Sequence, residues 1–308
     1  MRKTKTALTG IAISFAVLAV MVAALVAFDL RLHSRFDKIS GLNYRGYRGS
    51  VLGKKVPGEV RIGMFGGSVA MGYGTKYEAS IAALLERDLN DRTARTGRPG
   101  RYTVANLASN QEPELDYFKA NYELFRYLDL DVLIFYVADD TSTLSVANGE
   151  DVDQVVVSRR SSDPVLASFG YFFVFPTVVR EKYYMMRYGS IEKGYANDSI
   201  LDVFHRVLKP VQHRETKATG SLSGFIKEML RSDKKVIFAL APDLGPDVRR
   251  NLRHSFQELF PDSQGVALAD MESVFPPTDR SSYYLDGMHF SEKGNGAIAE
   301  RLALRLVP

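Results

Sequence analysis

Short apolar runs alternate along most of this chain with segments in which apolar residues recur every three or four positions. The first pattern is typical of strands buried inside a sheet, and the second is typical of amphipathic helices. The strands predicted in this way cover 59–65, 101–108, 131–138, 234–242 and 265–270. The run DVLIFYVA at 131–138 is apolar almost throughout, as expected for a strand that is covered on both faces.

Helical segments separate these strands. In 76–91 the apolar residues Ile81, Leu84, Leu85 and Leu89 share one helical face. Further helices are predicted over 115–128, 223–231, 246–260 and 291–306. Strands and helices that alternate at this spacing predict an α/β domain, here 59–308, in which helices cover both faces of a parallel sheet.

The alternation stops between 141 and 220, which we interpret as an insertion into the domain. Its segment SFGYFFVFPTVVREKYYMMRYG, at 168–189, is strongly aromatic. One interpretation is a helical insertion that packs on the core, as aromatic side chains usually do. The other is a lid over the site, or a surface that faces a membrane or an acyl chain.

An uncharged apolar segment lies near the N-terminus, at 6–28. It supplies the roughly 20 residues that a helix needs to cross a bilayer, and it exceeds the about 7–15 apolar residues of a signal peptide. We therefore predict a cytoplasmic tip and membrane anchor at 1–29, followed by a juxtamembrane connector at 30–58. The VAA at 22–24 is also compatible with cleavage as a signal sequence.

Basic residues flank the apolar segment on both sides. Arg2, Lys3 and Lys5 precede it, which favours a cytoplasmic N-terminus. Arginines and a lysine also follow it, but a large domain can cross the membrane despite such charges. The sequence therefore predicts that the C-terminal domain faces outward.

Composition excludes several kinds of site. The 308 residues include no cysteine, which excludes disulfides, cysteine metal sites and a cysteine nucleophile. The net charge is only +4 and no block of lysine and arginine stands out, so nucleic-acid binding is not predicted. The five histidines lack the spacing of metal ligands, so we expect no metal and no other cofactor.

Polar residues follow the predicted strands where a site would form, because parallel sheets bind ligands beyond the carboxyl ends of their strands. These ends carry Gly66-Gly67-Ser68, Asn106, Asp139-Asp140, Asp243 and Asp270. The glycine-rich GMFGGSVAMGYG at 63–74 matches neither the P-loop nor the dinucleotide fingerprint. Ser68 instead has the place of an exposed nucleophile, directly after a strand and near the positive end of a helix dipole.

A serine nucleophile needs a neighbouring base. Of the histidines, His289 stands out in the stretch YYLDGMHFSEKGNGAIA at 283–299, three residues after Asp286 and just before the last helix. This spacing allows Asp286 to accept a hydrogen bond from one ring nitrogen while the other nitrogen faces the serine. Ser291 in the same stretch has the features of a helix N-cap, so part of the stretch is structural.

Together these stretches resemble the SGNH, or GDSL-like, hydrolases over roughly residues 45–306. In that family the first strand ends in G-D-S or G-G-S, and D-x-x-H precedes the final helix. RIGMFGGSVAMGYG and YLDGMHFSEKGNGAIAERL match these blocks, and NYRGYRG is similar to the lead-in of membrane-anchored bacterial members. The resemblance implies a flavodoxin-like three-layer α/β/α sandwich with a five-stranded parallel sheet. It also implies that Ser68 is the nucleophile, His289 the base and Asp286 the group that orients it.

The middle blocks, which supply oxyanion donors in the family, differ here. The second block reads VANLASNQEPEL without its usual glycine, and Asn106 and Ala108 match its start. The third block, normally G-x-N-D, reads FYVADDTS, which places Asp139, or Asp140 if the alignment shifts by one, where an asparagine donates. An ionised aspartate cannot donate, whereas a protonated one could if its pKa were raised. The alternative donors are the Ser68 backbone N–H and a neighbour, and Gly67 is a further candidate.

Together with the apolar N-terminal segment, the resemblance implies a serine acyl-esterase in the bacterial inner membrane, single-pass, with its domain in the periplasm or otherwise outside the cytoplasm. The substrate would be an acylated, above all acetylated, envelope carbohydrate or a lipid-like ester. An O-acetyltransferase that uses the same triad is an alternative. The altered oxyanion blocks leave a third, a catalytically degenerate domain that binds glycan or acts as a scaffold. The presence of Ser68, Asp286 and His289 together favours an enzyme over the degenerate domain, but the sequence does not separate hydrolysis from transfer.

Overall fold

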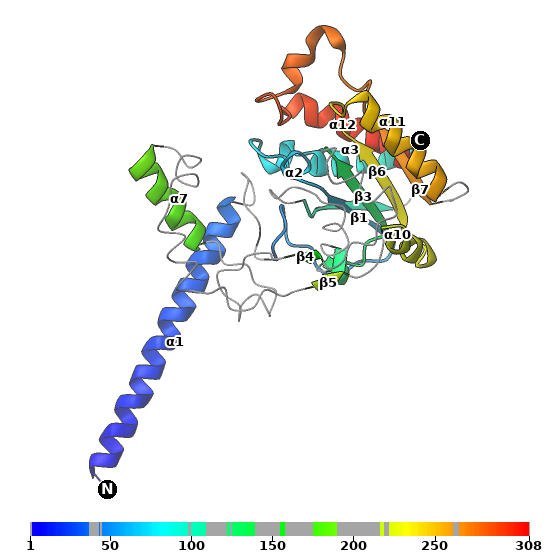
Figure 1. Ribbon diagram of the computed structural model, residues 1–308. Helices are drawn as coiled ribbons and strands as arrows, with labels where there is room; N and C mark the ends of the chain where they lie inside the picture. The colour runs from blue at the N-terminus through cyan, green and yellow to red at the C-terminus, as the bar shows by residue number, and fades with distance from the viewer. Residues whose placement is uncertain are drawn as a thin grey trace.

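A five-stranded parallel sheet forms the centre of the domain in the computed structural model (Figure 1). The structure describes residues 2–36, 43, 45–97, 100–108, 122–123, 125–138, 155–157, 175–189, 216–218, 222–260 and 265–307. The strands of the sheet are β1 (Glu59–Phe65), β2 (Arg101–Asn106), β3 (Val132–Val137), β6 (Lys235–Leu240) and β7 (Val266–Asp270). All five predicted strands are therefore confirmed.

The strands lie in the order β2-β1-β3-β6-β7, and every neighbouring pair is parallel. From β1 the chain moves to one edge of the sheet, and from β3 it moves through β6 and β7 to the other edge. Because crossover connections are right-handed, the helices of these two halves lie on opposite faces. The result is the predicted flavodoxin-like three-layer α/β/α sandwich.

Aromatic packing fixes one helical layer on the sheet. Phe135 of β3 contacts Phe225 at a ring-centroid distance of 6.3 Å, and Phe238 of β6 contacts Phe256 at 4.6 Å. The other layer is formed by the helix after β1 and the last helix of the chain, which pack against each other. The helices of the two layers are α10 (Leu222–Arg231) and α11 (Pro246–Leu259), and α3 (Ile81–Thr96) and α12 (Glu292–Leu306).

The predicted start of the helix at 76 was wrong. Tyr77–Ala79 forms a separate 3-10 turn, and α3 begins only at Ile81. Ser80 caps α3, because its hydroxyl oxygen accepts a hydrogen bond from the backbone N–H of Ala83 at 3.4 Å. Of the predicted helix at 115–128, the described residues end in a 3-10 turn at Arg126–Leu128, and residues 115–121 lie outside the described part.

Helix α1 (Arg2–Phe36) extends away from the sheet (Figure 1). Its segment Gly10–Leu32 is long and apolar enough to cross a membrane, by length and composition, as a signal sequence would also be. Near the carboxyl end of α1, the Asp29 carboxylate accepts a hydrogen bond from the backbone N–H of Phe175 at 2.7 Å. Phe175 begins α7 (Phe175–Tyr188), which belongs to the predicted insertion.

The described part of the insertion contains α7 and a two-stranded antiparallel sheet of β4 (Val155–Val157) and β5 (Thr216–Ala218). Apart from these elements and Gly189, residues 141–220 lie outside the described part of the chain. The choice between core insertion and lid therefore stays a prediction.

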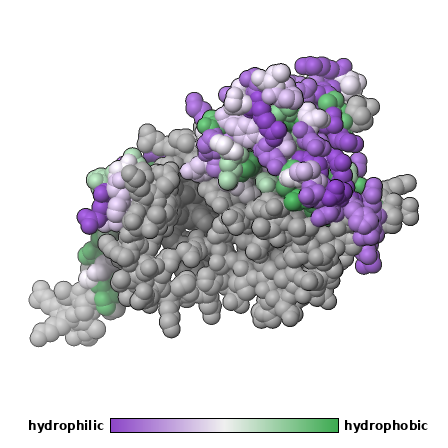
Figure 2. All heavy atoms as spheres, turned by 45° about the horizontal axis from the view of Figure 1, so that its top comes forward, coloured by the Kyte–Doolittle hydropathy of each residue, from purple (hydrophilic) through white to green (hydrophobic). Residues whose placement is uncertain are grey.

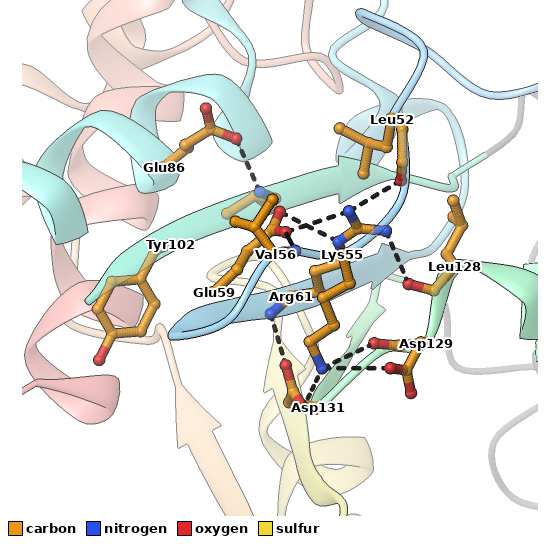
Figure 3. A network of polar contacts seen from close by, with 12 residues as sticks. Leu52, Lys55, Val56, Glu59, Arg61, Glu86, Tyr102, Leu128, Asp129 and Asp131 are labelled. Carbon is orange, nitrogen blue, oxygen red and sulfur yellow. Dashed lines mark hydrogen bonds and ion pairs between the residues drawn. The ribbon is translucent and has the colours of Figure 1, made fainter.

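A polar network binds the segment before β1 to the end of the sheet at which the strands begin (Figure 3). Lys55 Nζ lies 2.6 Å from the Asp131 carboxylate, which also accepts a hydrogen bond from the backbone N–H of Arg61 at 2.7 Å. The buried Arg61 guanidinium donates to the carbonyls of Leu128 at 3.1 Å and Gly53 at 2.9 Å. This network lies at the opposite end of the strands from Ser68.

Glu59 completes this network. Its carboxylate accepts hydrogen bonds from Arg61 Nε at 3.0 Å and from the backbone N–H of Val56 at 2.9 Å. Burial alone would raise the pKa of Glu59, but these hydrogen bonds outweigh it and lower the pKa from 4.5 to about 2. Folding therefore stabilises the ionised form of the Glu59 carboxyl group.

We expect Glu59→Gln to lower the free energy of unfolding by roughly 2 kcal/mol at pH 7. Because the folded pKa is depressed, the contribution of Glu59 is fully present above pH 4.5 and is lost as the pH falls toward 2. Urea unfolding of both proteins between pH 7 and pH 3 measures this. A difference in unfolding free energy that stays constant over that range would contradict the prediction.

Candidate active site

The serine lies in a tight turn at the carboxyl end of β1. Phe65 is the last strand residue, Gly66 and Gly67 follow, and Ser68 is the first residue of α2 (Ser68–Met71). Gly66 has φ +155°, and a Cβ there would lie 2.7 Å from the Cβ of Ala70 and 3.1 Å from that of Tyr136. Only glycine fits this conformation and this space without a shift, which explains the strand-Gly-Gly-Ser order.

The structure brings Ser68, His289 and Asp286 together. Ser68 Oγ lies 3.0 Å from His289 Nε2, although the two residues are 221 positions apart. The other ring nitrogen, Nδ1, lies 2.9 Å from Asp286 Oδ2 and 3.1 Å from Oδ1. An ionised carboxylate can only accept, so we assign the ring proton to Nδ1, which leaves Nε2 to accept from the serine hydroxyl.

The loop between β7 and α12 holds Asp286 in its ionised form. Its Oδ1 accepts hydrogen bonds from the backbone N–H groups of His289 at 2.7 Å and Met288 at 3.0 Å. These bonds, together with the imidazole, lower the pKa of Asp286 from 3.8 to about 2. The Leu285 N–H also donates to the His289 carbonyl at 2.8 Å, which closes the D-G-M-H turn. The carboxylate is therefore present over the whole neutral and mildly acidic range.

No protein-family model and no curated protein sequence matches this chain. Solved structures do resemble it, over about four fifths of its length. A member of the lipolytic protein G-D-S-L family from Veillonella parvula has 12% identity and a TM-score of 0.40, covering 80% of this chain and 98% of its own. The psychrotrophic esterase EstA from Pseudoalteromonas sp. has 11% identity and a TM-score of 0.42, covering 80% and 96%. A family two carbohydrate esterase from Clostridium thermocellum has 16% identity and a TM-score of 0.39, covering 84% and 66%.

The strand order, the serine after the first strand and the D-x-x-H turn before the last helix are the arrangement that the sequence resemblance predicts. The chain has the SGNH-hydrolase fold. Its Ser68, Asp286 and His289 occupy the places that the resemblance assigns to the SGNH triad, and their catalytic roles follow as a proposal below.

The second SGNH block supports the serine turn in this chain. Asn106 is fully buried, and its amide nitrogen lies 3.2 Å from the Met71 carbonyl and 3.5 Å from that of Ala70. Its amide oxygen accepts from the backbone N–H of Ala108 at 3.3 Å. The side chain of Asn106 is thus directed at the backbone of α2.

The remaining oxyanion candidates divide into two groups. Asp139 and Asp140 lie outside the described residues. Gly67 is buried, and it precedes Ser68, whose backbone N–H belongs to the first turn of α2 and so has no partner within the helix. The oxyanion roles of Gly67, Asn106, Ala108, Asp139 and Asp140 stay predictions.

Exposed apolar side chains flank the triad. The ring of Tyr73 lies 4.9 Å from that of His289, and Leu285 and Met288 belong to the same turn as Asp286. All three side chains are well exposed. Figure 2 shows that hydrophilic residues dominate the described part of its face, with small hydrophobic patches among them. A substrate at Ser68 would meet the exposed apolar side chains of Tyr73, Leu285 and Met288 beside the polar triad.

The other polar residues at the strand ends form ion pairs. Asp243 accepts from the Tyr284 hydroxyl at 2.5 Å and pairs with Arg280. Asp270 pairs with the buried Arg249 and with Arg253. Within the described ranges, no group of three or more histidine and acidic side chains is arranged to hold a metal ion.

Two buried polar residues near the serine turn were missed from the sequence, Arg48 and Asn295. Asn295 interrupts the apolar face of α12, which includes Ile298, Ala299 and Leu302. A polar residue on such a face is a signal that could have been found. Arg48 lies in the NYRGYRG stretch that resembles the family lead-in, but nothing in that stretch distinguishes it from Arg45 as the arginine that would be buried.

Proposed function

We propose that this chain is a membrane-anchored serine acyl-esterase of SGNH type. The observation that carries the proposal is the continuous contact from Ser68 Oγ to His289 Nε2 and from His289 Nδ1 to the Asp286 carboxylate. A hydroxyl, a base and an orienting acid in this order are what nucleophilic acyl transfer requires.

The reaction follows from these contacts. Ser68 Oγ attacks the ester carbonyl carbon while His289 Nε2 takes the hydroxyl proton, which gives a tetrahedral oxyanion. His289 returns this proton to the leaving alkoxide as the C–O bond breaks, and the acyl group remains on Ser68. Water then attacks the acyl-enzyme, with His289 again as the base, and releases the carboxylic acid. Asp286 keeps the imidazole in the required tautomer and stabilises its charged form.

We further propose where the protein is located and which substrate it acts on. Helix α1 would anchor the chain in the bacterial inner membrane, with the domain in the periplasm. The sequence resemblance supports acetyl groups on envelope carbohydrate as the substrate. The exposed ring of Tyr73 beside His289 is compatible with this, since an aromatic face can pack on a sugar ring.

Reaction of the full-length chain with a fluorophosphonate tests the proposal directly. We expect a single covalent adduct on Ser68, located by mass spectrometry of peptides, and no adduct after the protein has been denatured. Folded protein that remains unlabelled would contradict the esterase and favour the degenerate domain. In a second step, acetylated oligosaccharides and chromogenic acetyl esters are offered with and without a sugar acceptor. Release of free acetate identifies hydrolysis, whereas acetyl transfer to the acceptor identifies a transferase.

A further inference from the structure

The backbone turn that follows the serine helix is held by one buried arginine. Arg48 Nη1 donates to the carbonyls of Met71 at 2.5 Å and Gly72 at 2.8 Å, and its Nη2 donates to the carbonyl of Thr75 at 2.5 Å. Arg48 is only 1% exposed. One guanidinium thus donates to three backbone carbonyls of the segment 71–75, which begins three residues after Ser68.

This turn needs such a donor. Helix α2 has four residues, and it ends at Gly72 in the left-handed conformation with φ +79°. The Gly72 carbonyl also accepts from the backbone N–H of Thr75 at 3.2 Å and from its hydroxyl at 2.8 Å, and the Met71 carbonyl also accepts from Asn106. Among the hydrogen bonds of the described residues, only Arg48 donates to the Thr75 carbonyl, and leaving a buried carbonyl without a donor costs about 1–3 kcal/mol. The planar fork of a guanidinium can donate to several fixed acceptors at once, which an ammonium group cannot do in the same geometry.

Other buried side chains complete the support. Asn106 donates to the Met71 carbonyl from β2, as described above. From α12, the Asn295 amide donates to the Ala79 carbonyl at 2.8 Å and lies 3.5 Å from Thr75 Oγ1. Residues 71–79, which follow Ser68 along the chain, therefore bind side chains from three segments: Arg48 before β1, Asn106 in β2 and Asn295 in α12. Arg48 makes the largest number of these contacts.

Arg48 is itself held rigidly. Its backbone N–H donates to the Asn106 carbonyl at 3.0 Å, which adds a bridge beside the end of β2. The Asn43 side chain accepts from the backbone N–H of Arg45 at 2.9 Å and donates to the Gly49 carbonyl at 2.8 Å. Gly49 has φ +101° and packs against the Tyr77 ring, where a Cβ would lie only 2.5 Å from two of the ring carbons. The described residues of the stretch 43–49, in the predicted connector, are thus packed against the domain.

We propose that Arg48 is a positioning residue for the reaction at Ser68, so that the segment following the membrane helix is a working part of the active site. This inference rests on the proposed function. Arg48 does not touch the reacting atoms; it fixes the carbonyls of Met71, Gly72 and Thr75, and through them the orientation of Ser68 toward His289. Burial lowers the pKa of Arg48 to about 10, which still leaves the guanidinium charged at neutral pH.

A merely structural role is the alternative, and Arg61 provides a matched control. Arg61 is also a buried arginine that donates to backbone carbonyls, those of Leu128 and Gly53, but it lies near the amino-terminal end of β1, at the opposite end of the strand from Ser68. Arg48→Lys and Arg61→Lys therefore remove the same kind of contact at two places. Both substitutions should lower the melting temperature, but only Arg48→Lys should lower the reactivity of Ser68.

The test uses the full-length chain in detergent, with two readouts normalised to folded protein. The first is the second-order rate constant for fluorophosphonate reaction at Ser68. We expect Arg48→Lys to lower it by about 10- to 100-fold and Arg61→Lys by less than about twofold, since small displacements of a reacting group have effects of this size. The second is hydrogen exchange at Met71, Gly72, Tyr73 and Thr75, whose amides are bonded within this turn. Exchange there should be faster only in Arg48→Lys.

The outcomes are distinct. A wild-type reaction rate and wild-type exchange in Arg48→Lys would overturn the proposal. Equal losses of rate in the two variants would also overturn it, because the effect would then be one of general stability. If the wild-type chain itself fails to react, the proposed function falls. The exchange measurement then still decides whether Arg48 holds the serine turn.

Discussion

Ser68→Ala is expected to abolish fluorophosphonate labelling and to lower ester hydrolysis by at least about 10⁴-fold, and His289→Ala should cost about as much. The two side chains act as one unit, because the serine hydroxyl is a weak nucleophile until Nε2, 3.0 Å away, removes its proton. Losing either partner removes the same step. The double variant should therefore be hardly slower than either single variant, and this non-additivity is the diagnostic result.

The acid of the triad should behave differently. Asp286→Asn is expected to lower kcat by about 10³- to 10⁴-fold, because an amide at this place can fix the wrong imidazole tautomer. Since the pKa of Asp286 is about 2, its carboxylate stays ionised as the pH falls from 7 to 4. Activity lost by the wild-type protein in that range then comes from another group.

Steady-state kinetics with an acetyl ester measure these effects, and the exposed Asp247 in α11 provides the control. Asp247→Asn removes a carboxylate of the same domain that pairs only with Arg250 in the ion pairs described, and it should leave kcat unchanged. Retention of activity in Ser68→Ala would rule out Ser68 as the nucleophile. It would also leave the D-G-M-H turn without the role proposed for it.

The sheet could be predicted because each of its strands is a short, nearly continuous apolar run. Strands covered on both faces carry this signal over their whole length, and β1 was predicted with its observed bounds, Glu59–Phe65. Helix starts are harder to predict, because they depend on caps. The apolar spacing of α3 gave no sign that Tyr77–Ala79 would turn separately and that Ser80 would form the cap.

The placing of Ser68 and of the pair Asp286 and His289 could also be predicted, because each lies in a local motif next to a strand or helix end. The contacts of Arg48 could not. An arginine that follows an apolar segment normally remains in water or at a membrane surface, and burial of its guanidinium depends on three carbonyls that exist only once the serine turn has folded. Sequence distance hides such a contact, since Arg48 and Met71 are 23 positions apart.

Gly66→Ala is the substitution next to the triad for which we expect the largest combined loss. A backbone with φ +155° is unfavourable for alanine. The new Cβ would also lie 2.7 Å from Ala70 Cβ and 3.1 Å from the backbone oxygen of Tyr136. Strain and overpacking together should lower the free energy of unfolding by about 2–4 kcal/mol. Relief of the clash must move either β3 or α2, and a shift of α2 carries Ser68 away from His289. The rate of reaction in the folded fraction should therefore fall by about 100-fold.

Gly296→Ala in α12 is the matched control, because a Cβ at this position has no neighbour within 4 Å. The same change of residue should there stabilise the helix by up to about 1 kcal/mol and leave the reaction rate unaltered. Urea unfolding and the fluorophosphonate rate, measured on both variants, compare the two glycines directly. If Gly66→Ala were as stable and as reactive as Gly296→Ala, the close packing of Gly66 against Ala70 and Tyr136 would not be what positions the serine. The strand-Gly-Gly-Ser order would then need another explanation.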